Sequence, residues 1–254
     1  MSYVQIIFSP TGGTEKAAHA ITRNWSDDVK TIDLCDPSMD FSQCAISPED
    51  VVLIALPSYG GRVPELVAAR LRQVRGNGAR CILTCVYGNR AYEDTLVEME
   101  DIAKECGFTV FAAISAVAEH SIIHQYAAGR PDAQDEQLLK EFAGKIKAAL
   151  DDPAHAVHLA LPGNRPYKKQ GGGQLVPKAN NDCVKCGLCA KRCPTQAISK
   201  DHLETADADK CISCMRCVVK CPKGARKVNS VIVSAAALAI KKACSVRKEC
   251  ELFL

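Results

Sequence analysis

The first 150 residues alternate between short apolar runs and stretches in which apolar residues recur at helical spacing. The runs are continuous, as expected for strands of a parallel sheet that is buried on both faces. Strands that alternate with helices over short connections predict a right-handed, doubly wound α/β sheet of five parallel strands. Ligands of such sheets bind beyond the carboxyl ends of the strands. The expected strands occupy residues 3–8, 29–34, 51–56, 80–86 and 108–117.

Four helices are expected between and after these strands. The first follows the turn at residues 9–13, and the second begins near Pro64, whose fixed φ suits a first helical turn. A third apolar stripe ends at Gly107, a residue type that commonly terminates helices. Asp132 can cap the fourth helix, which extends to residue 150.

Composition divides the chain of 254 residues into segments. Hydrophobic residues make up 47% and charged residues 24%, a globular balance that excludes a disordered or collagen-like protein. Four prolines and the glycines at 171–173 predict a linker, partly stiff and partly loose. The expected segments are a sheet domain at 1–150, this linker at 151–180, a small α+β cysteine-rich domain at 181–225 and a docking segment at 226–254.

Charge and cysteine are both distributed unevenly. Residues 1–180 hold 18 Lys and Arg against 22 Asp and Glu (net −4), whereas residues 181–254 hold 14 against 7 (net +7). Of the 15 cysteines, five precede residue 180 and ten follow it. The first residues lack the cationic and long apolar regions of a secretory signal, so we expect a cytoplasmic protein with reduced thiols. Metal or iron-sulfur ligation then explains the cysteine cluster better than disulfides do.

Two copies of one cysteine pattern follow each other with a period of 28 residues. Each copy has the spacing C-x2-C-x2-C-x3-C-P. In this pattern the first three thiolates of a copy bind one 4Fe-4S cluster, and the fourth binds the other cluster. The alternative is a pair of zinc sites, since sulfur-rich tetrahedral sites also bind zinc. The expected ligand sets are Cys183, Cys186, Cys189 and Cys221 for one cluster, and Cys193, Cys211, Cys214 and Cys217 for the other.

Through these motifs, residues 180–225 resemble the bacterial two-cluster ferredoxins. The resemblance implies two 4Fe-4S clusters and low-potential electron transfer. A segment of this size with few large apolar side chains can hardly fold by burial alone. The clusters are therefore expected to be structural as well as redox-active.

The loop after the first expected strand has the composition of a phosphate site. Ser9, Thr11, Gly12, Gly13 and Thr14 offer hydroxyl groups, close backbone approach and a helix N-terminus. A plain capping turn made by Thr14 is the alternative. The loop has neither the Walker lysine nor the glycine spacing of dinucleotide sites. It resembles the flavodoxin phosphate loop S-x-T-G-N-T, with Gly13 in place of asparagine, which implies bound FMN and the strand order 2-1-3-4-5.

Two further loops are expected to flank the isoalloxazine ring of that FMN. The loop after the third strand contains Pro57, Ser58, Tyr59, Gly60 and Gly61, of which Tyr59 is the candidate that stacks on the ring. A glycine-rich turn with a surface tyrosine is the alternative. The next loop is expected to hydrogen-bond the ring edge or to cover its second face, through Tyr87, Gly88, Asn89, Arg90 and Tyr92.

Other cysteines and a histidine are assigned to packing rather than chemistry. The five early cysteines are expected in the core, and Cys85 is the one that lies near the expected flavin. His120 is expected to be structural, and Cys244 and Cys250 form no recognisable metal site. Residues 231–240 are too few to span a bilayer and predict a docking helix.

The basic tail predicts a redox partner protein with an acidic docking surface. It lacks the interleaved aromatic residues of nucleic-acid binding, and no segment predicts a membrane span. Over about residues 1–225 the chain resembles the fused flavodoxin and ferredoxin proteins of the "ferrodoxin" family. That resemblance implies an electron carrier in which two clusters exchange electrons with FMN, and exposed clusters imply an anaerobic host.

Two other functions stay open at this point. The first is an enzyme that reduces a small molecule at the flavin, with the clusters as wiring and His120, Arg90 or Tyr92 as proton donor or substrate clamp. The second is a nucleotide sensor that carries zinc, which would be colourless.

Overall fold

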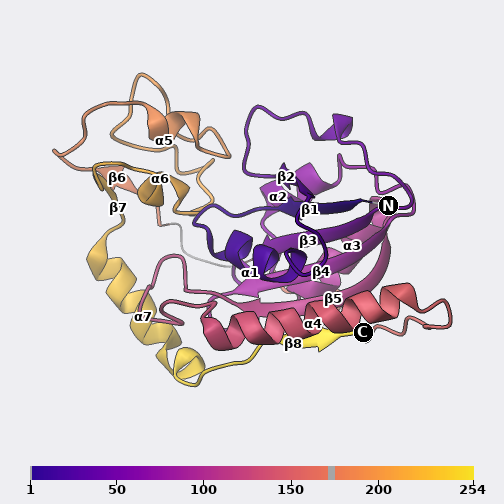
Figure 1. Cartoon of the computed structure of the whole chain (residues 1–254). Helices are drawn as coiled ribbons and strands as arrows, with labels where there is room; N and C mark the ends of the chain where they lie inside the picture. The colour runs from indigo at the N-terminus through magenta and orange to yellow at the C-terminus, as the bar shows by residue number, and fades with distance from the viewer. Residues whose placement is uncertain (1, 171–174) are drawn as a thin grey trace.

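The computed structural model describes residues 2–170 and 175–254. Five parallel strands form its centre in the order β2-β1-β3-β4-β5. This order is that of the flavodoxin-like sheet and confirms the expected fold class. Helices flank the sheet in the doubly wound arrangement (Figure 1). The strands are β1 (Tyr3–Ile7), β2 (Val29–Asp33), β3 (Val51–Pro57), β4 (Arg80–Tyr87) and β5 (Thr109–Val117).

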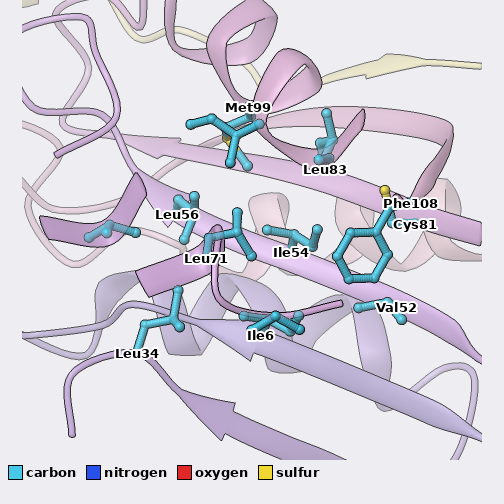
Figure 2. Packing of buried hydrophobic residues seen from close by; sticks show 14 of the residues in the cluster. Ile6, Leu34, Val52, Ile54, Leu56, Leu71, Cys81, Leu83, Met99 and Phe108 are labelled. Carbon is cyan, nitrogen blue, oxygen red and sulfur yellow. The ribbon is translucent and has the colours of Figure 1, made fainter. Parts of the chain in front are cut away.

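Two apolar cores lie on opposite faces of the sheet. Side chains of a strand alternate between its faces, so Val52 and Ile54 of β3 join one core, whereas Leu53 joins the other. Figure 2 shows the first core, in which Leu71 and Met99 pack against the sheet. That core lies under α2 (Glu65–Leu71) and α3 (Thr95–Glu105), and the second lies under α1 (Gly13–Thr22) and α4 (Ala133–Asp151).

The C-terminal segment contains the expected helix and one strand that the sequence did not predict. Strand β8 (Glu251–Phe253) pairs with β5 in the antiparallel direction and becomes the sixth strand of the sheet. Helix α7 (Ser230–Cys244) lies where the docking helix was expected, and the side chain of Asn229 caps it. One side of α7 packs on Ile123 and on Tyr126, whose hydroxyl donates to the Ala237 carbonyl at 2.7 Å.

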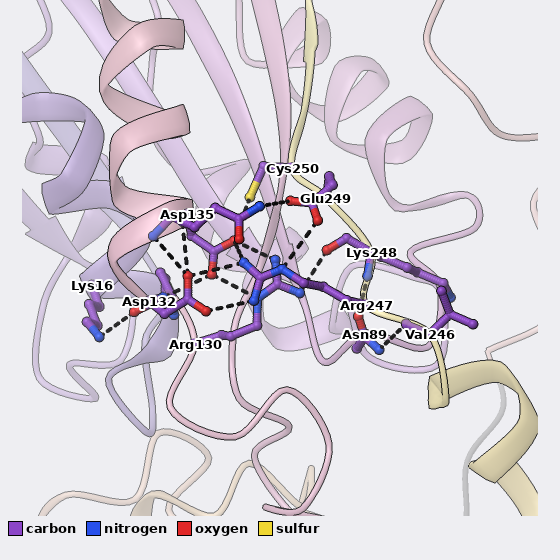
Figure 3. Close-up of polar contacts among 12 residues, drawn as sticks. Lys16, Asn89, Arg130, Asp132, Asp135, Val246, Arg247, Lys248, Glu249 and Cys250 are labelled. Carbon is purple, nitrogen blue, oxygen red and sulfur yellow. Dashed lines mark hydrogen bonds and ion pairs between the residues drawn. The ribbon is translucent and has the colours of Figure 1, made fainter.

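A buried ion pair anchors this C-terminal segment (Figure 3). Arg130 donates to the fully buried Asp135 at 2.8 Å and 2.5 Å, and also to the carbonyl of Lys248 at 2.7 Å. Arg247 contacts Asp132 at 2.7 Å and Asp135 at 3.1 Å. Because both arginines bind Asp135 at the start of α4, residues 247–250 are held against the sheet domain.

The expected linker is attached to the sheet domain along part of its length. The backbone N–H groups of Asn164 and Lys168 donate to Asp94 at 2.8 Å and 2.7 Å, and Arg165 pairs with Asp101 at 2.7 Å. Leu159 and Leu161 pack on the first core, so this part of the segment is not a free tether. The glycines at 171–173, on which the expected looseness rested, lie outside the described residues.

The small domain consists of two short hydrogen-bonded strands and two single-turn helices. Strand β6 (Lys178–Ala179) pairs antiparallel with β7 (Arg226–Lys227), so the ordered unit begins before and ends after residues 181–225. Its helices are α5 (Leu188–Lys191) and α6 (Arg216–Val219); a short 3-10 helix, η1 (Phe41–Gln43), belongs to the sheet domain. None of the described helices is long and apolar enough to cross a membrane.

Candidate functional site

Eight cysteines of the small domain surround two separate hollows. The thiols of each hollow come from both copies of the repeat, three from one copy and the fourth from the other. These are the same two sets that the sequence predicts as cluster ligands. The first hollow is lined by Cys183, Cys186, Cys189 and Cys221, and the second by Cys193, Cys211, Cys214 and Cys217.

The backbone repeats its conformation with the same period of 28 residues. Lys185 and Ser213 are both left-handed, with φ of 54° and 53°, and so are Gly187 and Met215, with φ of 74° and 60°. Such a conformation is unfavourable for residues other than glycine. The same conformation recurs in both copies, including at residues other than glycine. The geometry of the cysteine loops is therefore a specific feature of this fold. Each copy then starts its short helix at the next residue, Leu188 or Arg216.

Backbone N–H groups point at the sulfur atoms in both copies. The N–H groups of Ala197 and Ala225 donate to Cys193 and Cys221, respectively, both at 3.3 Å. Hydrogen bonds to ligand sulfurs stabilise the negative charge of an iron-sulfur site. Four soft thiolates around one hollow, with N–H groups aimed at them, therefore fit a 4Fe-4S cluster. Within residues 2–170 and 175–254, no three His, Cys, Asp or Glu side chains are placed to hold a single metal ion.

Burial keeps two of these thiols protonated in the metal-free protein. Desolvation raises the pKa of Cys214 to about 12 and that of Cys217 to about 11. Thiols bind iron as thiolates. Metal binding at this hollow must therefore release these protons. The bound metal then stabilises the buried thiolates, which are unfavourable without it.

A cleft of about 690 Å³ lies at the carboxyl end of the parallel strands. Its size is within the range of small-molecule and cofactor sites. Loops that follow β1, β3, β4 and β5 all contribute to its wall, as expected for a doubly wound sheet. Of the residues that the sequence assigns to FMN, the cleft is lined by Thr11, Gly13, Thr14, Pro57, Ser58, Tyr59, Gly60, Tyr87, Gly88 and Arg90.

The start of α1 provides hydrogen-bond donors at this cleft. The helix begins at Gly13 after the left-handed Gly12, with no side-chain cap at that position. Ser9 accepts from the N–H of Glu15 at 2.9 Å, but no acceptor among the described residues is assigned to the N–H groups of Gly13 and Thr14. Free N–H groups at a helix N-terminus favour an anion. This arrangement suits a phosphate group better than a plain capping turn at Thr14.

Five residues of the predicted FMN set do not line this cleft. Ser9 and Gly12 instead line a smaller hollow beneath the loop. The carbonyl of Gly61 accepts from the N–H of Asp94 at 3.0 Å. Gly61 has a left-handed φ of 86°, and a side chain at this position would collide with Glu93. These three residues shape the loops that carry the cleft.

The other two, Asn89 and Tyr92, are directed at the C-terminal segment. The amide of Asn89 donates to the carbonyls of Cys244 and Val246 at 3.1 Å and 2.9 Å (Figure 3). The Tyr92 hydroxyl donates to Glu251 at 2.7 Å, and its ring packs edge-on against Tyr87. Both side chains therefore have partners away from the expected ring.

Several residues of the cleft were missed or set aside at the sequence level. His120 lines it and accepts the N–H groups of Ile122 and Ile123 at its Nδ1, at 3.2 Å and 3.1 Å. Burial lowers the pKa of His120, so the ring is neutral near pH 7 and its other nitrogen carries the proton. Ala236 and Ile240 of α7 close the cleft from another side. No local sequence pattern indicates this role, because it depends on where α7 docks.

The cysteines outside the small domain do not line the cleft. Cys85 is fully buried in the first core, where desolvation raises its pKa. Cys244, the last residue of α7, belongs to the apolar cluster of Ile123 and Tyr126, and Cys250 joins the second core. These placements match the assignment of the early cysteines to packing and give Cys244 and Cys250 a structural role.

The second thiol hollow directly adjoins the cleft. Cys211 lines both of them, and Ile212 and Ser213 also face the cleft. Burial, and to a smaller extent the thiol of Cys214 in this hollow, raise the pKa of Tyr59 in the cleft. The first hollow shares no lining residue with the cleft among the described residues.

Two arginines connect the sheet domain with the small domain. Arg70 of α2 donates to the carbonyl of Pro194, the residue after a thiol of the second hollow, at 2.7 Å. Arg216 of α6 donates to the carbonyl of Ser9 in the phosphate-type loop at 3.3 Å and lies 3.7 Å from Asp33. Both contacts hold the second hollow, rather than the first, against the sheet domain.

Comparison with known proteins gives one family match and several structures of similar fold. Residues 182–226 match the family of 4Fe-4S dicluster domains. Flavodoxin 1 from Bacillus cereus is 15% identical, covers 58% of this chain and 98% of its own, and has a TM-score of 0.41. The Fusobacterium nucleatum flavodoxin bound to flavin mononucleotide is 15% identical, covers 58% of this chain and 98% of its own, and has a TM-score of 0.40. The Streptococcus pneumoniae TIGR4 flavodoxin is 19% identical, covers 58% of this chain and 99% of its own, and has a TM-score of 0.41. No curated protein matches the chain.

The chain thus joins a flavodoxin-like domain, defined by its sheet order, to a 4Fe-4S dicluster domain. A dicluster domain implies two 4Fe-4S clusters. The combination implies a role in electron transfer.

Proposed function

We propose that the protein is an electron-transfer protein in which two 4Fe-4S clusters exchange electrons with FMN bound in the cleft. Each thiol hollow would hold one cluster through its four cysteines. The observation that carries the proposal is Cys211, which lines both the second hollow and the cleft. The cluster in the second hollow and the FMN in the cleft would then be separated by little more than the thickness of one cysteine loop.

The residues of the cleft suit FMN in distinct ways. The N–H groups of Gly13 and Thr14 would bind its phosphate at the positive end of α1. Tyr59 would cover one face of its ring. Gly88 also lines the cleft and packs so closely on His120 that a Cβ at this position would lie 2.8 Å from that residue. Bound FMN supplies both one-electron and two-electron chemistry, whereas each cluster supplies one-electron chemistry.

The partner is proposed to be an acidic redox protein that docks over the first hollow. Cys186 is exposed there, whereas Cys193 and Cys214 of the second hollow are buried. Exposed cations surround the first hollow, among them Lys185 and Lys223. A basic surface next to an accessible cluster favours rapid association with an acidic partner. We place this activity in the cytoplasm of an anaerobe, since an exposed cluster is vulnerable to oxygen.

Cofactor analysis after anaerobic purification tests the proposal. We expect eight iron atoms and one FMN per chain, with broad iron-sulfur absorbance and a redox titration in which both cofactors respond. A colourless protein that contains zinc, or one without flavin, would contradict it.

Paired cysteine substitutions test which thiols share a cluster. A variant with both Cys193→Ala and Cys217→Ala loses two ligands of one hollow and is expected to keep half of the iron. The matched control, Cys193→Ala with Cys186→Ala, loses one ligand from each hollow and is expected to lose most of the iron. Equal iron contents in the two variants would refute the crossed ligand sets.

The geometry also supports a second candidate, a flavin-dependent reductase of a small molecule. The cleft is closed on one side by α7, and the N–H of the neutral His120 ring would donate a hydrogen bond that holds a substrate in place. Arg90 is paired with Glu93 at 3.0 Å and Tyr92 with Glu251, so His120 is the strongest of the three residues considered for this role. Substrate-dependent oxidation of the reduced protein that is slowed in His120→Gln, with FMN content unchanged, would favour this candidate.

A further inference from the structure

A buried arginine lies in the wall between the two thiol hollows. Arg226 lines the first hollow, and its side chain is among the largest that are fully buried, with only 2% of the residue exposed. One of its terminal nitrogens lies 3.8 Å from the sulfur of Cys189. Another terminal nitrogen donates at 2.8 Å to the carbonyl of Pro177, a residue that lines the second hollow. One positive charge therefore lies at the first hollow and beside a lining residue of the second.

The charge of Arg226 is not neutralised by a carboxylate among the described residues. Its other partners are the carbonyls of Leu203 at 2.5 Å and of Pro177 at 2.8 Å. The Nε atom is buried and has no hydrogen-bond partner. Burial of an unpaired charge costs several kcal/mol, so a guanidinium in this position requires negative charge nearby. The cluster ligands beside it would supply that charge, the nearest being Cys189.

The internal repeat shows that this arginine is specific to one copy. With a period of 28 residues, the position equivalent to Arg226 is Ile198, which is also buried and lines the second hollow. The neighbouring alanines, Ala197 and Ala225, are equivalent and make the same N–H contact to sulfur. An apolar residue therefore suffices for the fold at this point in one copy, while the other copy carries a buried cation.

We propose that Arg226 is the internal counter-ion of the two clusters and raises their reduction potentials. The inference rests on the proposed function, because it requires both clusters to be present. Each cluster takes up one electron on reduction, and its total charge becomes more negative by one unit. A buried cation with N–H donors stabilises that reduced state more than the oxidised state. The contact to Cys189 makes the effect larger for the cluster of the first hollow.

Reduction potentials of matched variants test this role. Arg226→Met removes the charge and keeps the length of the side chain, Arg226→Gln also keeps a donor, and Arg226→Lys keeps the charge. Lys223→Gln is the control, since it removes an exposed charge from the lining of the same hollow, where water screens it. The potentials are measured on the iron-loaded full chain by anaerobic dithionite titration, followed by EPR.

We expect the reduction equilibrium of at least one cluster to weaken tenfold or more in Arg226→Met and Arg226→Gln, a shift of about 59 mV to lower potential. Arg226→Lys should shift by less than half as much, and Lys223→Gln by less than either neutral variant. Unchanged potentials in a neutral variant with full iron content would overturn the proposal. Absence of the clusters from the wild-type protein would instead refute the proposed function.

Cluster retention decides the outcome if the neutral variants do not load fully. If charge compensation is the role of Arg226, Arg226→Lys retains more iron than Arg226→Met and Arg226→Gln. If all three variants lose iron equally while the circular dichroism of the sheet domain is unchanged, the guanidinium acts only as a structural brace and the proposal is wrong. The iron-free protein gives an independent readout, because wild type should then be destabilised by its uncompensated charge relative to Arg226→Met.

Discussion

Loss of the two interdomain arginines should separate the cofactors without removing them. Arg70→Met removes a hydrogen bond of 2.7 Å from a charged donor to the Pro194 carbonyl, an interaction worth about 1.5–3 kcal/mol. Arg216→Met removes a longer bond of 3.3 Å to Ser9, and its Nε is buried without a partner, so we take the lower limit of about 1.5 kcal/mol. The contact to Asp33 adds little, since that carboxylate is 42% exposed.

These magnitudes translate into how often the interface opens. Each 1.4 kcal/mol changes an equilibrium tenfold, so opening should rise roughly 10- to 100-fold in Arg70→Met and about tenfold in Arg216→Met. Hydrogen exchange followed by mass spectrometry measures this opening at residues 209–216, a segment that lines the cleft through Asp209, Cys211, Ile212 and Ser213. Arg72→Met is the control, since Arg72 directly follows α2 but pairs on the surface with Glu105.

The variants also distinguish a docking role from a purely local one. If the arginines hold the domains together, exchange accelerates at residues 209–216 in both variants, more in Arg70→Met, and is unchanged in Arg72→Met. Wild-type exchange rates in both interdomain variants, at full cofactor content, would refute the reasoning.

Three further results are expected. Gly88→Ala places a Cβ 2.8 Å from His120, and overpacking of about 1–3 kcal/mol should lower the melting temperature by about 2–10 °C, whereas Gly144→Ala, with open space in α4, should not lower it. Burial lowers the pKa of His120, so unfolded chains bind an extra proton below about pH 6.5 and the stability of the protein decreases as the pH is lowered. The melting temperature of His120→Gln should therefore depend less on pH between 7.5 and 5.5 than that of the wild type, and an unchanged slope would contradict this. Removal of iron with a chelator should expose residues 178–227 to protease while the fluorescence of Trp25, buried between α1 and α4, stays constant; a shifted spectrum would show that both domains depend on the clusters.

The sheet and the thiol sets could be predicted because their signals are local and repeated. Five apolar runs gave the five strands, and the cysteine period of 28 residues returned as equal φ angles at Lys185 and Ser213. The resemblance to flavodoxins supplied the strand order. Each of these features depends on spacing within a short stretch of sequence.

Features that depend on contacts between distant segments could not be predicted in this way. Strand β8 has three residues, too few to show an alternating pattern, and it exists because Arg130 and Arg247 hold the chain end near β5. Asn89 belongs by position to a flavin loop, yet its amide is bonded to the end of α7. In the sequence Arg226 is one of many cations in the basic tail, and only its burial beside the first thiol hollow distinguishes it.

The rate of electron exchange within one molecule tests the central claim most directly. The flavin is reduced by a light pulse under anaerobic conditions, and flavin and iron-sulfur absorbance are followed at several protein concentrations. The shared lining residue Cys211 predicts that the electron reaches the clusters within milliseconds, at a rate independent of concentration. Exchange that occurs only with an added mediator, or at a rate proportional to protein concentration, would contradict the account.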